Sequence, residues 1–213
     1  MAPFSKWGQK EPSPLPPLFA FVSLWPMEIE QHPFEPFLPK NARILFLGSF
    51  PPQPHRWCLP FYYPNWINDF WRIMGLIHFN DKDHFCIINE KRFNEADIRE
   101  FCAQNGLAFY DTATEIKRLK DNASDAFLEV VTPTDIPALL QQIPLCTTIV
   151  TTGQKATEII AQTFNCTIPP VGSHIETTIA NRNITFWRMP STSRAYPLPL
   201  NKKADFYRQL FKM

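Results

Sequence analysis

Residues 61–71 combine side chains that could act together on a planar ligand and a water molecule. Several aromatic residues stand beside Asn65, Asn68 and Asp69. Aromatic rings stack on nucleobases, and amide or carboxylate oxygens can hold a water molecule. The same residues also fit the start of a helix, with Asn65 or Asn68 as its cap and the aromatic rings in the core. The pattern alone leaves both interpretations open.

Three further segments carry residues suited to binding. Residues 48–52 place a glycine and two prolines after an apolar run, which allows a backbone to approach a ligand closely, although such turns are common. Thr151 and Thr152 offer hydroxyls that donate or accept hydrogen bonds. Residues 191–194 offer hydroxyls, amides and one arginine to phosphates, or simply form a capped loop. The basic residues at 117–120 fit a solvated face or a phosphate contact.

Each of these segments is positioned by a predicted strand. A continuous apolar run at 44–47 and segments rich in apolar residues at 107–110, 147–150 and 183–189 predict four strands covered on both faces. Helical spacings predict helices over 66–76, 94–104 and 132–142, a further helix after residue 153, and a closing helix through 206–211. This alternation predicts an α/β fold with a mainly parallel sheet. Ligands of such sheets bind beyond the carboxyl ends of the strands, so the candidate segments should converge there.

Composition sets limits on the function. The 213 residues carry a net charge of +1, with 45% hydrophobic and 19% charged residues, as in a single globular domain. Contact with a polyanion would therefore depend on a local basic patch. The five cysteines form no CxxC pair and the histidines are scattered, so no metal site is predicted. Reduced cysteines predict a cytoplasmic protein.

The first 26 residues differ from the rest of the chain. They contain many prolines, and their apolar stretch is too short to span a bilayer. We expect residues 1–26 to be a disordered leader, or Met27 to be the true start. No other segment predicts a membrane span. Residues 27–213 are expected to form one domain.

The order of the motifs resembles the hypoxanthine-DNA (deoxyinosine) glycosylase group of the uracil-DNA glycosylase superfamily. The similarity covers about residues 31–212. The residues that carry it are His32-Pro33-Phe34, Gly48-Ser49-x-Pro51, Tyr62-Tyr63, Asn68-x-Phe70-Trp71, Thr152-Gly153-Gln154-Lys155-Ala156 and Pro190-Ser191-Thr192-Ser193.

This resemblance implies a three-layer α/β/α sandwich and a monofunctional DNA glycosylase that hydrolyses the N-glycosidic bond of a deaminated base, hypoxanthine or uracil. It implies Asn68 as the residue that positions the attacking water, with no cofactor or metal, DNA as the partner and a monomeric state. The expected base pocket comprises Gly48, Ser49, Phe50, Tyr63, Thr151 and Thr152. The expected DNA-binding residues are Pro190, Ser191, Thr192, Ser193 and Arg194.

Three positions depart from the group's pattern. Pro52 replaces a usual glycine, Asn65-Trp66 replaces a usual His-Pro, and Met189 stands where some superfamily members have histidine. These changes bear on the substrate more than on the fold. Two other functions stay open, namely a catalytically silent module that binds DNA lesions and a hydrolase of free nucleosides or nucleotides.

Overall fold

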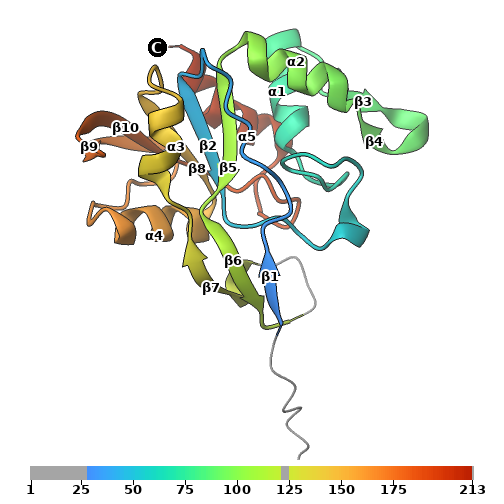
Figure 1. Ribbon diagram of the computed structural model, residues 1–213. Coiled ribbons are helices and arrows are strands. Elements are labelled where there is room, and N and C mark those ends of the chain that lie inside the picture. The colour runs from blue at the N-terminus through green and yellow to red at the C-terminus, as the bar shows by residue number, and fades with distance from the viewer. Residues whose placement is uncertain (1–27, 121–124, 213) are drawn as a thin grey trace, which may run out of the picture.

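The computed structural model describes residues 28–120 and 125–212. Its main sheet has five strands in the order β5-β2-β8-β10-β9 (Figure 1). Their bounds are β2 Ile44–Gly48, β5 Leu107–Asp111, β8 Thr148–Thr152, β9 Ser173–Ile179 and β10 Arg182–Met189. The first four in the order are mutually parallel, and β9 pairs antiparallel to β10 at the edge. The chain is therefore a mixed α/β protein with a mainly parallel central sheet, as the apolar runs predict.

The expectation of about four strands is too low because it misses β9. This edge strand alternates exposed and inward-facing residues and so lacks a continuous apolar run. It joins β10 through Ala180 and Asn181, whose φ angles of 53° and 57° both lie in the left-handed region. Two consecutive left-handed residues are typical of a tight hairpin.

Two smaller sheets were also not predicted. The larger is antiparallel, in the order β1-β6-β7, and lies below the main sheet in Figure 1. Its strands are β1 Ile29–Gln31, β6 Ala113–Arg118 and β7 Leu128–Pro133. The other pairs β3 Cys86–Ile87 with β4 Arg92–Phe93. Because β7 ends at Pro133, the helix predicted over 132–142 begins only at Ile136, where the Asp135 side chain accepts from the Ala138 amide.

Five α-helices accompany the main sheet. They are α1 Phe70–Phe79, α2 Glu95–Gln104, α3 Ile136–Gln142, α4 Gln154–Thr163 and α5 Leu200–Tyr207. In Figure 1, α3 and α4 lie in front of the sheet and α5 lies behind it. Helices α2 and α4 follow the predicted positions. Helix α1 starts at Phe70 rather than 66, because residues 61–69 form a loop, and α5 starts at Leu200, ahead of the predicted 206.

Aromatic side chains dominate the core beside α1. Phe46 of β2, Phe109 of β5, and Phe70 and Trp71 of α1 are fully buried and pack with ring centroids 4.9–5.7 Å apart. Such contacts hold α1, and therefore the loop before it, against the sheet. None of the helices in residues 28–120 and 125–212 is long and apolar enough to cross a membrane. The expected leader, residues 1–26, lies outside the described part of the chain.

Candidate active site

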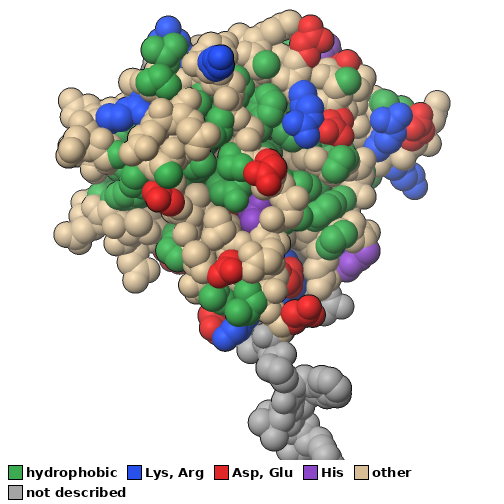
Figure 2. All heavy atoms as spheres, viewed as in Figure 1, with side chains coloured by type: hydrophobic (Ala, Val, Ile, Leu, Met, Phe, Trp, Pro, Cys, Tyr) green, Lys and Arg blue, Asp and Glu red, His purple; other side chains and the backbone are tan. Residues whose placement is uncertain are grey.

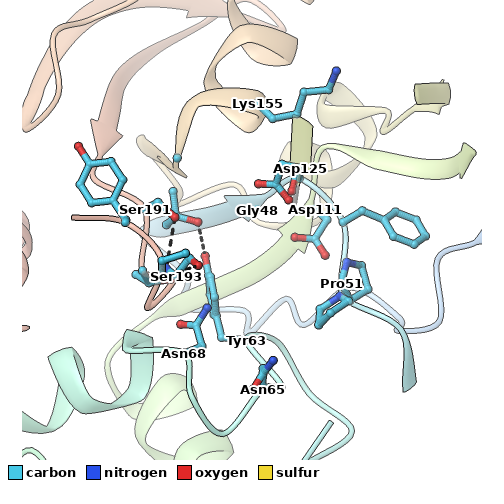
Figure 3. Close-up of a pocket in the computed structure, with 18 of the residues that line it drawn as sticks. Gly48, Pro51, Tyr63, Asn65, Asn68, Asp111, Asp125, Lys155, Ser191 and Ser193 are labelled. Atoms are coloured by element: carbon cyan, nitrogen blue, oxygen red, sulfur yellow. Dashed lines mark hydrogen bonds between the residues drawn. The ribbon is translucent and has the colours of Figure 1, made fainter. Parts of the chain in front are cut away.

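A cavity of about 880 Å³ opens at the carboxyl ends of the parallel strands. Strand register explains the convergence, because Gly48 pairs with Asp111, Leu47 with Thr151, and Thr152 with Met189. The segments that follow β2, β5, β8 and β10 therefore start at one level, and all four contribute lining residues. The described lining includes Gly48, Ser49, Phe50, Pro51, Tyr63, Asn65, Asn68, Asp111, Asp125, Thr152, Gly153, Lys155, Ser191, Thr192, Ser193 and Arg194 (Figure 3).

Ten of the twelve expected site residues line this cavity, and Thr151 and Pro190 do not. Thr151 is completely buried, and its hydroxyl interacts with the Thr157 hydroxyl at 2.8 Å and donates to the Trp187 carbonyl at 3.1 Å. Successive strand residues point to opposite faces, so only Thr152 of the pair reaches the cavity. The Pro190 carbonyl accepts a hydrogen bond from the Tyr207 hydroxyl at 2.8 Å. The position of Thr151 gives no support to a base-contacting role.

Asn68 lies on the cavity wall immediately before α1. Its side-chain Oδ1 accepts a hydrogen bond from the Phe70 backbone amide at 2.9 Å. The Asn68 backbone amide donates to the Asn65 backbone carbonyl at 2.8 Å. The Asn68 side chain thus satisfies a backbone amide at the helix start and also borders the cavity, while its role toward a water molecule stays a prediction. The helix start fixes the side chain in place, which is what positioning a water molecule requires.

Asp69 connects the cavity wall that carries Asn68 to the loop at residues 191–194, which forms the opposite wall. Its Oδ2 lies 2.8 Å from Lys203 Nζ, and its Oδ1 lies 3.4 Å from Arg194 Nε. Lys203 also donates to the Ser193 carbonyl at 2.7 Å, and the Asp69 amide donates to the Thr192 carbonyl at 2.9 Å. Asp69 and Lys203 are 3% and 1% exposed, so water does not weaken their attraction. Asp69 is a structural residue that holds the two walls together.

Tyr63 adopts a backbone conformation that is unusual for a residue with a side chain. Its φ is 53°, and its ring stacks on Phe70 with a centroid distance of 3.8 Å and an interplanar angle of 5°. The Tyr63 hydroxyl hydrogen bonds the Thr152 hydroxyl at 2.9 Å across the cavity wall. Burial raises the pKa of Tyr63 well above its ordinary value, so the phenol stays neutral. Strain of this kind persists where surrounding contacts fix the residue, often beside a functional site.

Two acidic residues of the cavity were not predicted as site residues. Asp111 ends β5, and Asp125 follows β6. Burial and the charge of Asp111 raise the pKa of Asp125, while the Ser49 side chain and the nearby Arg118 and Lys155 lower it. The sequence signal for Asp111 was its place at a strand end, where a charged residue directly follows a buried apolar run.

Lys203 was also missed, although it interacts with both walls. It shares the buried face of α5 with Ala204 and Tyr207. A lysine at an inward-facing helical position needs a buried partner, and this was the available signal. The partner, Asp69, lies 134 positions away in the sequence.

Positive charge around the cavity is local rather than general. Arg118 donates to both Glu30 carboxylate oxygens at 2.9 Å and to the Pro51 carbonyl at 3.2 Å, so its charge is largely balanced. Lys155 and Arg194 also line the cavity. Basic and acidic side chains are interspersed over the face shown in Figure 2. Within the described ranges, no group of histidine, cysteine, aspartate and glutamate residues could hold a metal ion.

Comparisons with known proteins support the fold. No family model and no curated protein matches the chain. The chain is similar to the solution NMR structure of a "putative Uracil DNA glycosylase" from Methanosarcina acetivorans, with 20% sequence identity and a TM-score of 0.57. The match covers 87% of this chain and 98% of the other. At this identity, the likeness shows that the two chains share a fold.

Proposed function

We propose that this protein is a monofunctional DNA glycosylase that hydrolyses the N-glycosidic bond of a deaminated base, hypoxanthine or uracil, and leaves an abasic site. We place it in the uracil-DNA glycosylase superfamily, closest to the hypoxanthine-DNA glycosylase group, with the three-layer sandwich of that superfamily. It would act as a cytoplasmic monomer in base excision repair. The proposal is supported by the fold that this chain shares with the "putative Uracil DNA glycosylase" from Methanosarcina acetivorans.

The observation that carries the proposal is that Asn68, Thr152 and Ser191 border one cavity. These residues come from three separate segments and match three motifs of the group. The cavity volume, about 880 Å³, is in the range of ligand sites and admits a nucleotide turned out of the helix. Tyr63 and Phe50 add aromatic surface to the same cavity.

The reaction follows from what the lining residues offer. The oxygen of a water molecule held by Asn68 would bond to the sugar C1′ as the bond from C1′ to the base nitrogen breaks. The base leaves with the bonding electrons and takes up a proton, while the water loses one. The Asn68 carbonyl dipole would stabilise the cationic sugar. Ser191, Ser193 and Arg194 would contact phosphates beside the flipped nucleotide.

A duplex cleavage assay tests this proposal against its alternatives. Labelled duplexes with one hypoxanthine, uracil or xanthine are incubated with the protein, and abasic sites are then cleaved with alkali. Strand breaks at hypoxanthine or uracil are expected. A mobility shift without breaks would instead indicate a silent lesion-binding module. Hydrolysis of free inosine or uridine without duplex cleavage would indicate a nucleoside hydrolase.

A further inference from the structure

Arg72 is a buried cation in the first turn of α1. It is the third residue of the helix and is only 8% exposed. Buried arginines are normally paired with carboxylates, yet within the described ranges Arg72 takes part in no ion pair. The start of a helix is also the end at which the helix dipole disfavours positive charge. Other contacts must therefore compensate for the burial of this charge.

The compensating contacts come largely from the loop that carries Asn68. Arg72 Nη1 donates to the Trp66 backbone carbonyl at 2.7 Å and to the Asn68 backbone carbonyl at 3.2 Å. The guanidinium carbon lies 4.3 Å from the centroid of the Trp66 ring and 5.1 Å from that of Phe93. Such cation–π contacts are strongest where water is excluded, as it is around a buried arginine. Arg72 thus holds both the carbonyl and the ring of Trp66.

Trp66 is one of the positions at which the sequence departs from the pattern of the glycosylase group it resembles. Proline, the usual residue there, has no aromatic face for a guanidinium to stack on. The Trp66 ring also packs against Phe93, with centroids 5.1 Å apart. Next to it, Asn65 Oδ1 accepts a hydrogen bond from the Ile67 amide at 3.1 Å. The two departing residues, Asn65 and Trp66, therefore both take part in fixing this loop.

We propose that Arg72 is a positioning residue that sets the direction of the Asn68 side chain at the cavity wall. This inference rests on the proposed glycosylase function. Arg72 holds the Asn68 backbone carbonyl, while the Phe70 amide holds Asn68 Oδ1, so the residue is fixed at its backbone and at its side chain. Arg72 is not among the described residues that line the cavity, whereas Asn68 is (Figure 3). Arg72 therefore acts through Asn68 and not on the substrate.

The substitution Arg72→Met tests this role, because methionine keeps apolar bulk but has neither charge nor donor. Single-turnover excision rates and DNA affinities are measured on hypoxanthine and uracil duplexes. We expect the rate to fall roughly 10- to 100-fold while the affinity stays within a few-fold, since a small misplacement of Asn68 slows the reaction without removing a DNA contact.

Arg99→Met is the matched control. The Arg99 guanidinium carbon also lies 4.3 Å from an aromatic centroid, that of Phe61, but Arg99 lies on α2 and outside the described lining of the cavity. Its loss removes a comparable cation–π contact without touching the Asn68 loop. This variant should excise both bases at the wild-type rate.

Combination with Asn68→Ala separates a positioning role from a merely structural one. If Arg72 acts through Asn68, Arg72→Met should slow the residual excision in the Asn68→Ala background by no more than about threefold. A structural role elsewhere in the site would give the same factor in both backgrounds. Equal factors would overturn the proposal, and so would an unchanged rate in the single variant.

A milder variant covers the case in which Arg72→Met does not fold. Arg72→Lys keeps the charge but loses the planar guanidinium that stacks on Trp66. It should slow excision at least about threefold when Asn68 is present and have no effect in the Asn68→Ala background. No loss, or equal losses, would overturn the role of Arg72 while the wild type remains active. A wild type that excises neither base would overturn the glycosylase function itself and this inference with it.

Discussion

Lys203 Nζ and Asp69 Oδ2 lie 2.8 Å apart in the interior, although 134 positions separate the two residues in the sequence. Asp69 directly follows Asn68, and Lys203 also donates to the Ser193 carbonyl. The pair therefore connects the helix start that carries Asn68 to the loop expected to contact phosphates. Together with the bond from the Asp69 amide to the Thr192 carbonyl, this buried pair holds the two segments in contact.

Removing one member of this pair should lower the stability of the protein. Lys203→Met leaves the Asp69 carboxylate buried with only Arg194, at 3.4 Å, as a charged partner. The free energy of unfolding should fall by about 3–5 kcal/mol, as for other buried pairs that lose one charge. Urea unfolding measures this change. The double variant Asp69→Asn with Lys203→Met should recover part of the loss, and a loss below about 1 kcal/mol in the single variant would contradict the role assigned to the pair.

Gly48→Ala should reduce excision more than it reduces stability. The added Cβ overlaps Asp111 Oδ1, so the carboxylate must rotate away from its place at the cavity wall. We expect the single-turnover rate on hypoxanthine to drop at least about 10-fold while the protein remains folded. Rate measurements beside thermal melts check this expectation. An unchanged rate would show that the position of Asp111 does not matter for the reaction.

Asp125 predicts a particular dependence of stability on pH. Its pKa is raised in the folded protein, chiefly by burial, so the folded state holds its proton to higher pH than the unfolded state does. Between these two pKa values the folded state binds more protons, and stability falls as pH rises. Asp125→Asn removes this contribution. The wild type should therefore lose stability relative to the variant above about pH 4, which urea unfolding at a series of pH values measures. A constant difference would contradict the raised pKa.

Tyr63→Phe tests the contact across the cavity wall. The variant keeps the ring stacked on Phe70 but loses the hydrogen bond to the Thr152 hydroxyl. Stability should fall by about 1 kcal/mol. In a double-mutant cycle with Thr152→Val, the two effects should be clearly less than additive, because both remove the same bond. Additive losses would show that the bond contributes nothing.

The sequence was most informative where burial is uniform. Strands β2, β5 and β8 are covered on both faces, so they are rich in residues that tolerate burial and their positions could be predicted. Strand β9 alternates exposed and inward-facing residues, and β6 pairs with β7 in a stretch where no strand was predicted. Such edge and hairpin strands are stabilised by pairing with neighbours, which short-range patterns do not reveal.

The candidate site was predictable only where its motifs are local. Asn68, Thr152 and Ser191 follow strands or precede a helix, so topology brings them together. Asp111 and its partner His32 are 79 residues apart, and neither belongs to a short pattern that would pair them. The sequence placed both Thr151 and Thr152 in the base pocket. Successive residues of a strand face opposite sides of the sheet, and the sequence did not show which of the two threonines faces the cavity.

The most direct test of the central claim is the single-turnover excision rate of Asn68→Ala on a hypoxanthine or uracil duplex, measured with its DNA affinity. We expect the rate to fall by about 100-fold or more while affinity stays within a few-fold, because Asn68 would act on the water and the cationic sugar. Asn105→Ala provides a matched control, since that amide bonds only the Phe101 carbonyl, away from the cavity. An Asn68→Ala variant that remains folded and as fast as wild type would contradict the account.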